Sequence, residues 1–214
     1  MCGRFTVLSY DEVAAVAAAV ERRLAPPVLS AVHEPRSQAF PGNTIPLISP
    51  NEAGTPEVSQ AIWGFQTEWS KRLVFNTRIE SAIGGSAMWR EAAEQGRCLI
   101  PVATFFEPHA TETVPSPRTG RPLKRPYEFA SPAGAPLLLA GMRLHDRCSI
   151  VTCEPNRSVA PIHDRMPLIL RFEEVGMWLS PQWPDLADRR DVELSVQPEP
   201  LEAPEQPEQL SLFD

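Results

Sequence analysis

The sequence lacks several features that would place it among membrane, secreted or repeat proteins. No apolar run approaches the roughly 18 residues that a membrane helix needs, and no repeats are visible. The first residues show no charged stretch followed by an apolar one, so we expect no secretory signal peptide. These absences predict a soluble cytoplasmic protein with no membrane partner, and nothing in the sequence indicates more than a monomer.

Cysteine is scarce. The chain of 214 residues has four, Cys2, Cys98, Cys148 and Cys153. Their irregular spacing argues against a disulfide framework, and we interpret the last three as small buried hydrophobic residues. A zinc site built from His145, Cys148 and Cys153 is conceivable, but the spacing fits no known zinc pattern. We therefore predict no metal and no cofactor.

Acidic residues are unevenly distributed along the chain. The net charge of −7 argues, taken alone, against nucleic-acid binding. Residues 191–214 contain seven acidic residues and no lysine or arginine, and without them 20 acidic residues face 20 basic ones. The rest of the chain is nearly neutral and can therefore carry a local basic groove.

The composition changes near residue 196. Hydrophobic residues make up 43% of the chain, enough for one sizeable core. Residues 196–214 are acidic and rich in proline, and cannot build a core. We predict one domain over 1–195 and a disordered tail over 196–214.

Local patterns predict a mixture of short helices and strands. Residues 9–12 form a capping box that opens an alanine-rich helix reaching about Leu24, before the Pro26-Pro27 pair. Strands are predicted over 45–49, 58–63, 97–106, 127–130, 136–141 and 148–153, and short helices over 86–95 and 172–179. Residues 109–126, with four prolines and four basic residues, are predicted to form a long basic loop.

Cys2 follows the initiating methionine. Aminopeptidases remove Met before small residues, so Cys2 is expected to become a terminal 1,2-aminothiol. Its α-amine, with a reference pKa of about 7.7–8.0, is partly neutral at pH 7. Such an amine attacks an aldehyde to give a Schiff base, and the neighbouring thiol can then close a thiazolidine ring. Taken alone, Cys2 is better explained as chance sequence at a frayed terminus.

Three further segments carry polar side chains next to apolar runs. Asn76, Arg78 and Glu80 alternate, so on a strand they share one face. Glu107 follows an apolar run, where burial would raise its pKa and suit proton transfer. His163 lies beside an acidic and a basic residue, just ahead of an apolar strand, and could act as a general acid or base. A solvated strand face, an exposed strand end and a capping or core histidine are the alternatives for these residues.

Taken in order, these segments resemble one family. The sequence reads MCGRF at residues 1–5, WGF at 63–65 followed by Trp69, NTRIES at 76–81, RCLIPVATFFEP at 97–108 and IHDRMPLIL at 162–170. Together they resemble the SRAP (SOS response-associated peptidase) family over about residues 1–180. The resemblance implies an α+β fold, a single domain with a mixed β-sheet core and flanking short helices. It also implies covalent capture of abasic sites in single-stranded DNA through a thiazolidine at the terminal cysteine.

The resemblance also implies roles for individual residues. Cys2 would be the nucleophile, Asn76 would orient it or the opened sugar, Glu107 would be the acid/base, and His163 would move protons for ring opening and reversal. The implied DNA-binding residues are Gly3, Arg4, Trp69, Asn76, Arg78 and Arg165. Single-stranded DNA with abasic sites would be the partner, and a nucleoid association would follow.

The chain departs from the family pattern at two places. Pro108 stands where the family has a tryptophan after the glutamate, which removes an aromatic that could stack on a base. Residues 38–41 read Gln-Ala-Phe-Pro in place of the family's Asn-x-Ala-Pro. DNA affinity or context preference is therefore expected to differ.

The last residues resemble a bacterial sliding-clamp-binding peptide. Gln209, Leu210, Leu212 and Phe213 would dock on the clamp, with the disordered segment before them as a tether. The alternative is that these apolar side chains fold back onto the domain.

Two other functions compete with covalent capture. Class II glutamine amidotransferases also begin Met-Cys-Gly, but this chain has no Asn-Gly pair for their oxyanion motif. A peptidase role, which the family name suggests, would need Cys2 to remove a leader, yet only Met1 precedes it and ordinary processing suffices. A non-covalent single-strand-binding module would keep the arginines and not need Cys2.

Overall fold

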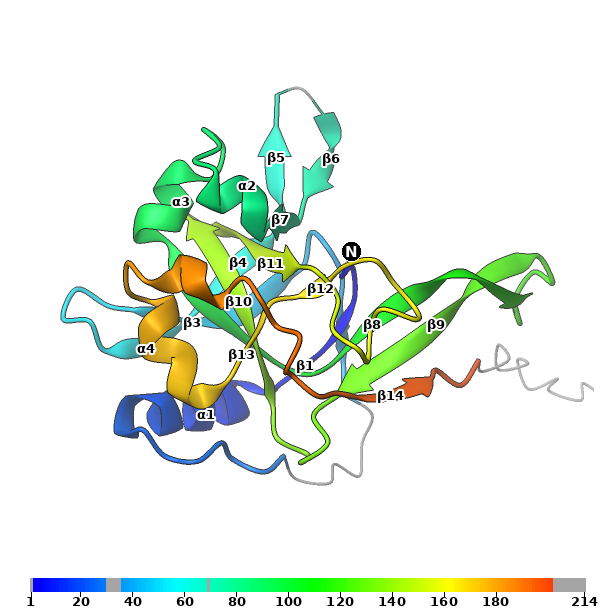
Figure 1. The fold of residues 1–214 in the computed structure, drawn as a ribbon, viewed down its shortest axis with the longest axis horizontal. Helices are drawn as coiled ribbons and strands as arrows, with labels where there is room; N and C mark the ends of the chain where they lie inside the picture. The colour runs from blue at the N-terminus through cyan, green and yellow to red at the C-terminus, as the bar shows by residue number, and fades with distance from the viewer. Residues whose placement is uncertain (1, 30–35, 69, 202–214) are drawn as a thin grey trace, which may run out of the picture.

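The computed structural model describes residues 2–29, 36–68 and 70–201 (Figure 1). In this part of the chain twelve strands form one mixed sheet, two more form a separate hairpin, and short helices flank them. The predicted α+β class is confirmed. Among the described helices, none has both the length and the apolar character needed to span a membrane.

The strands and helices have the following bounds. The strands are β1 (Phe5–Val7), β2 (Gln38–Ala39), β3 (Thr44–Pro50), β4 (Pro56–Trp63), β5 (Phe65–Thr67), β6 (Ser70–Val74), β7 (Asn76–Arg78), β8 (Arg97–Pro115), β9 (Pro122–Ala130), β10 (Leu137–Leu144), β11 (Arg147–Cys153), β12 (Met166–Pro167), β13 (Ile169–Leu170) and β14 (Ser195–Pro198). The helices are α1 (Tyr10–Arg22), α2 (Ile79–Ile83), α3 (Arg90–Gln95) and α4 (Val175–Trp178), with 3₁₀ turns at Phe172–Glu174 and Trp183–Leu186.

The main sheet closes on itself through β8. The path runs β10-β11-β4-β3-β8, and β8 pairs again with β10, from Leu137↔Val102 to Met142↔Arg97. Most pairs are antiparallel, but β11 runs parallel to both β4 and β7. Closure removes exposed edges from this part of the sheet and encloses a side-chain core. Because β8 is 19 residues long, it continues beyond the closed part, where residues 102–105 pair with β1 and residues 104–115 pair with β9.

Helix α1 forms as predicted and covers β3 and β4. The Ser9 hydroxyl accepts from the Glu12 N–H while the Glu12 carboxylate accepts from the Ser9 N–H, which is the expected capping box. Val13, Val16 and Ala17 are buried at helical spacing. The helix ends at Arg22, before Leu24, with a left-handed residue at its C-cap.

The prediction of a long basic loop over residues 109–126 is wrong. β8 continues to Pro115, β9 starts at Pro122, and the two pair as Thr113↔Lys124 and Val114↔Leu123. Figure 1 shows this hairpin projecting away from the rest of the sheet; we call residues 109–126 the arm. Prolines usually exclude a strand, but on a two-stranded projection they can occupy positions whose N–H would face solvent.

The prediction of a disordered tail over 196–214 is also wrong for its first three residues. Ser195–Pro198 forms β14, which pairs antiparallel with β9 from Ser195↔Ala130 to Pro198↔Tyr127. The clamp-like residues Gln209, Leu210, Leu212 and Phe213 lie outside the described residues, and so does Trp69.

Candidate active site

The four residues predicted to carry the chemistry come from distant segments and meet beside the start of β1. Cys2 precedes β1, Asn76 begins β7, Glu107 lies in β8, and His163 lies between β11 and β12. The Asn76 Nδ2 donates a hydrogen bond to the Cys2 carbonyl at 2.9 Å. The His163 Nε2 lies 3.7 Å from the Glu107 Oε2. We call these four residues the Cys2 cluster.

Strand pairing fixes the position of Cys2 next to Glu107. Phe5 pairs with Phe105, and the Phe106 N–H donates to the Arg4 carbonyl at 3.0 Å. The chain before β1 therefore runs antiparallel to residues 106 and 107. This register brings Cys2 close enough for the Glu107 charge to act on its thiol.

Glu107 is a buried carboxyl group. Its side chain has no solvent exposure. Burial raises the pKa of Glu107 to about 7, and the negative charge of Asp164 acts in the same direction. A carboxyl group with this pKa is partly protonated near neutral pH, so it can both donate and accept a proton there.

Contacts within its own loop orient the His163 ring. Its Nδ1 lies 3.0 Å from the Arg165 nitrogen, 3.1 Å from the Arg165 carbonyl oxygen and 3.1 Å from Asp164 Oδ1, which leaves Nε2 facing Glu107. Burial lowers the pKa of His163, although Asp164 opposes this shift. A neutral imidazole and a protonatable carboxyl group thus lie side by side at neutral pH.

The thiol of Cys2 is fully buried and protonated. Burial, followed by the charge of Glu107, raises the pKa of the Cys2 thiol above its ordinary value, and the sulfur lies 3.7 Å from the Arg4 carbonyl. The environment therefore opposes a free thiolate, the form in which cysteine is the stronger nucleophile.

Asn76 occupies a buried position between the N-terminal segment and the sheet. β7 runs parallel to β11, with Asn76 opposite Ile150, and the residue is 9% exposed. Its amide nitrogen is used on Cys2, whereas its buried Oδ1 has no hydrogen-bond partner within the described residues. Buried acceptors are normally satisfied, so this oxygen is available to a donor from a bound molecule or from the amine of Cys2.

The arginines predicted to contact DNA have different environments. Arg4 forms a two-pronged ion pair with Glu199, and its guanidinium also lies 4.0 Å from the centre of the Phe106 ring. Arg165 makes two bonds to the Glu80 carboxylate, at 2.8 and 2.9 Å, and a third to the Thr152 carbonyl. Arg78 is exposed at the end of β7.

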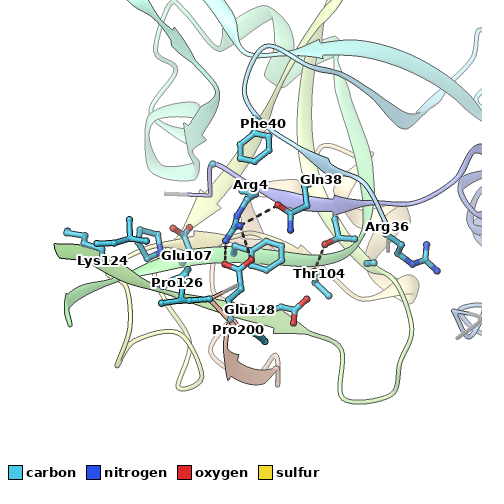
Figure 2. Close-up of a pocket in the computed structure, with 18 of the residues that line it drawn as sticks. Arg4, Arg36, Gln38, Phe40, Thr104, Glu107, Lys124, Pro126, Glu128 and Pro200 are labelled. Carbon is cyan, nitrogen blue, oxygen red and sulfur yellow. Dashed lines mark hydrogen bonds and ion pairs between the residues drawn. The ribbon is translucent and has the colours of Figure 1, made fainter. Parts of the chain in front are cut away.

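A cavity of about 1170 Å³ adjoins the Cys2 cluster (Figure 2). Glu107 borders it, together with the predicted residues Gly3 and Arg4. Figure 2 shows Arg4 reaching into it beside Gln38, between Phe40 and Glu107. Glu107 therefore belongs both to the buried cluster and to the wall of an accessible space.

The sequence missed several residues of this cavity wall. They include Phe106, Lys124, Pro126 and Glu128 from β8 and β9, and Glu199, Pro200 and Leu201 from the chain after β14, whereas Pro108, which the sequence analysis singled out, also lines the cavity. Residues 106 and 108 are two positions apart, so recognition of a continuous strand would have placed them on one face. The prolines of this region instead led to the prediction of a loop. For Glu199, which follows β14, no local signal exists.

The described residues contain no group of three or more His, Cys, Asp or Glu arranged to hold a metal ion. Cys148 and Cys153, considered for zinc, are both fully buried in β11. Trp178 covers the other structural cysteine, since its indole N–H donates to the Cys98 carbonyl at 3.0 Å.

Comparison with known proteins gives consistent matches. A family model described as SOS response associated peptidase (SRAP) matches residues 1–204. Abasic site processing protein YoqW of Bacillus subtilis is 27% identical over 202 residues, covering 85% of this chain and 81% of the relative. Abasic site processing protein YedK of Escherichia coli is 25% identical over 194 residues, covering 84% and 79%. A phage-related protein of Bordetella bronchiseptica shares the fold, with a TM-score of 0.67, 22% identity, and coverage of 92% and 94%.

Proposed function

The chain belongs to the SOS response associated peptidase (SRAP) family, and on that premise we propose that it processes abasic sites in single-stranded DNA by bonding to them covalently through Cys2. The relatives named abasic site processing proteins support the substrate. The observation that carries the covalent chemistry is the Cys2 cluster, in which a protonatable carboxyl group and a neutral imidazole adjoin a cysteine next to the initiating methionine.

The first bond in this proposal is made by the amine. Removal of Met1 gives Cys2 a free α-amine, which attacks the aldehyde carbon of the ring-opened deoxyribose. The resulting carbinolamine loses water to give an imine. The thiol cannot lead because its raised pKa keeps it protonated; it adds to the imine carbon afterwards, and its proton passes to the nitrogen. One water is released overall, and the product is a thiazolidine.

Each residue of the Cys2 cluster has a task in this sequence. Protonated Glu107 donates to the departing hydroxyl of the carbinolamine, and its pKa of about 7 supplies that form at neutral pH. Neutral His163 accepts a proton during opening of the sugar ring. Asn76 fixes the Cys2 backbone through its 2.9 Å bond and offers its free oxygen to the amine or to a sugar hydroxyl.

DNA would approach along the cavity and across Arg78. Arg78 is exposed, whereas Arg165 is committed to Glu80 and is better suited to holding the His163 segment in place. Phosphate contacts of this kind position a strand without reading its sequence. An abasic nucleotide has no base to unstack, which lowers the cost of drawing it toward Glu107.

A thiol hydrolase is the alternative function for this site. Such an enzyme needs a cysteine that readily loses its proton to an adjacent base. Here burial and the Glu107 charge both act against the thiolate, which favours chemistry that begins at the amine. Replication-coupled action is a further part of the proposal and rests on the predicted clamp-binding tail.

The decisive experiment combines single-stranded DNA bearing one abasic site with untagged protein whose loss of Met1 has been verified by mass spectrometry. We expect a heat-stable band on a denaturing gel, with a mass equal to protein plus DNA minus one water. An oligonucleotide without the abasic site should give none.

Cys2→Ala is the matched variant because it keeps the amine and loses only the thiol. It should form a Schiff base that borohydride traps and heat destroys, and no heat-stable product. A heat-stable product from Cys2→Ala would exclude the thiazolidine, and the absence of any product from the wild type would exclude covalent capture.

A further inference from the structure

The chain after β14 is bound to the wall of the cavity. The Glu199 N–H donates to the Pro126 carbonyl at 3.0 Å, and this bond extends the β14–β9 pairing by one residue. Two side-chain bonds strengthen the pairing, from Ser195 Oγ to the Ala130 carbonyl at 3.1 Å and from Gln197 Nε2 to Glu128 Oε2 at 2.7 Å. We call residues 195–201 the strap.

The carboxylate of Glu199, in the strap, binds Arg4. One Glu199 oxygen accepts from Arg4 Nη1 at 2.9 Å, and the other accepts from Nη2. The planar fork of arginine binds a carboxylate and a phosphate in the same two-pronged way. Glu199 therefore occupies the position in which Arg4 would hold a phosphate.

The surroundings of Arg4 preform this anion site. The guanidinium lies over Phe106, and Gln38 Oε1 accepts from Nη1 at 3.4 Å, so the side chain is held from two sides before any ligand arrives. Both members of the ion pair remain accessible to solvent, with side-chain exposures of 23% for Arg4 and 19% for Glu199. An ion pair of this kind contributes little net stability and can be exchanged.

We propose that Glu199 is an intramolecular ligand of the phosphate site at Arg4, and that single-stranded DNA must displace the strap to bind there. The inference rests on the proposed function for the identity of the competing anion. Pro200 and Leu201 line the same cavity as Glu107, so displacement of the strap also widens the approach to the Cys2 cluster.

The test measures non-covalent binding of a labelled single-stranded oligonucleotide without an abasic site, by fluorescence anisotropy, to the full-length protein. Glu199→Gln keeps the size of the side chain and removes its charge. We expect it to bind about two- to fivefold more tightly, the range that corresponds to removal of one exposed ion pair. Glu193→Gln is the matched control, because Glu193 is exposed just before the strap and its substitution makes the same change in net charge.

Arg4→Ala and the Arg4→Ala/Glu199→Gln double variant complete a double-mutant cycle for Arg4 and Glu199. Arg4→Ala should weaken binding, and adding Glu199→Gln to it should have no more effect than Glu193→Gln. The strap would be merely structural if Glu199→Gln bound DNA no better than Glu193→Gln, or if its gain persisted without Arg4. Glu199→Ala repeats the measurement in case Gln preserves a hydrogen bond to Arg4.

Covalent capture is scored separately, on the abasic oligonucleotide at saturating protein. Failure of capture by the wild type would overturn the proposed function, while the affinity comparison would still decide the role of the strap. If wild type and Glu199→Gln reach the same end point of capture while Glu199→Gln binds DNA more tightly, the results would support both the proposed function and the role of the strap.

Discussion

The Nε2 atom of His163 lies 3.7 Å from the Oε2 atom of Glu107, although the two residues belong to elements separated by more than fifty positions. The carboxyl side chain is fully buried and the imidazole is 16% exposed. Proton transfer between solvent and the buried carboxyl group can therefore pass through the histidine, whose Nε2 faces that group.

Glu107 gives stability a specific pH dependence. Its pKa is raised in the folded state, so the folded protein keeps a proton that the unfolded chain loses between about pH 4.3 and 7. Stability should fall as the pH rises through this window, by roughly 3 to 4 kcal/mol. Glu107→Gln resembles the protonated carboxyl group and should lack this fall. Thermal melts of both proteins at pH 5 and pH 8 test this.

The two proteins should melt at similar temperatures at pH 5, with Glu107→Gln the more stable at pH 8. Capture of abasic DNA should nevertheless be slower in the variant, by about a hundredfold or more, because a general acid is removed. If the difference in melting temperature between the wild type and Glu107→Gln were the same at pH 5 and pH 8, Glu107 would not be buried as a neutral acid.

His163→Ala should impair reversal more clearly than capture. Formation of the imine depends on Glu107, whereas ring closure of the released sugar requires a base near the abasic carbon. Transfer of protein from a short labelled abasic oligonucleotide to an excess of a longer one measures reversal directly. A His163→Ala protein that exchanges as fast as the wild type would remove the residue from the reverse reaction.

Asn76→Asp should slow capture more than Asn76→Ala. Alanine deletes the donor to the Cys2 carbonyl, which costs about 1 kcal/mol. Aspartate keeps the shape but replaces the amide nitrogen, which lies 2.9 Å from the Cys2 carbonyl oxygen, with a carboxylate oxygen. Repulsion between the two oxygens should displace Cys2. Single-turnover capture rates at saturating DNA separate the two. The opposite order would mean that the free Oδ1 matters more than the bond to Cys2.

The arm should add salt-sensitive affinity for DNA. Arg118, Arg121 and Arg125 make no ion pair within the described part of the chain, and Lys124 lines the cavity at the base of the arm. Arg118→Gln/Arg121→Gln should lower the slope of log affinity against log salt by about 0.7 for each phosphate that is no longer neutralised. Anisotropy titrations at several salt concentrations measure this slope.

Arg22→Gln/Arg23→Gln is the control for net charge. These residues lie at the end of α1, which Figure 1 shows on the far side of the molecule from the arm. An equal change of slope in both double variants would attribute the effect to overall charge and not to the arm.

The C-terminal peptide is expected to bind a bacterial sliding clamp. Leu212→Ala/Phe213→Ala should abolish binding to purified clamp in surface plasmon resonance, because these apolar side chains would fill its pocket. Capture of abasic DNA in the absence of clamp should not change. A reduced melting temperature in the variant, without clamp binding by the wild type, would instead favour a tail packed on the domain.

The sequence determined features that depend on neighbouring residues. The capping box of α1, the strands over 45–49 and 58–63, and the chemistry available at Cys2 all follow from residues a few positions apart. The family resemblance that these motifs carry also predicted that Cys2, Asn76, Glu107 and His163 belong to one site, although no local pattern could give their distances.

Only the tertiary structure decided the remaining relationships, because they depend on which strands pair. Burial of Glu107, and hence its raised pKa, comes from the packing of several segments around β8. The arm is a strand pair despite its prolines because each strand supplies partners to the other. Arg4 and Glu199 are 195 positions apart, and they meet because β14 pairs with β9 while β1 pairs with β8. No property of either residue's neighbours in sequence encodes that contact.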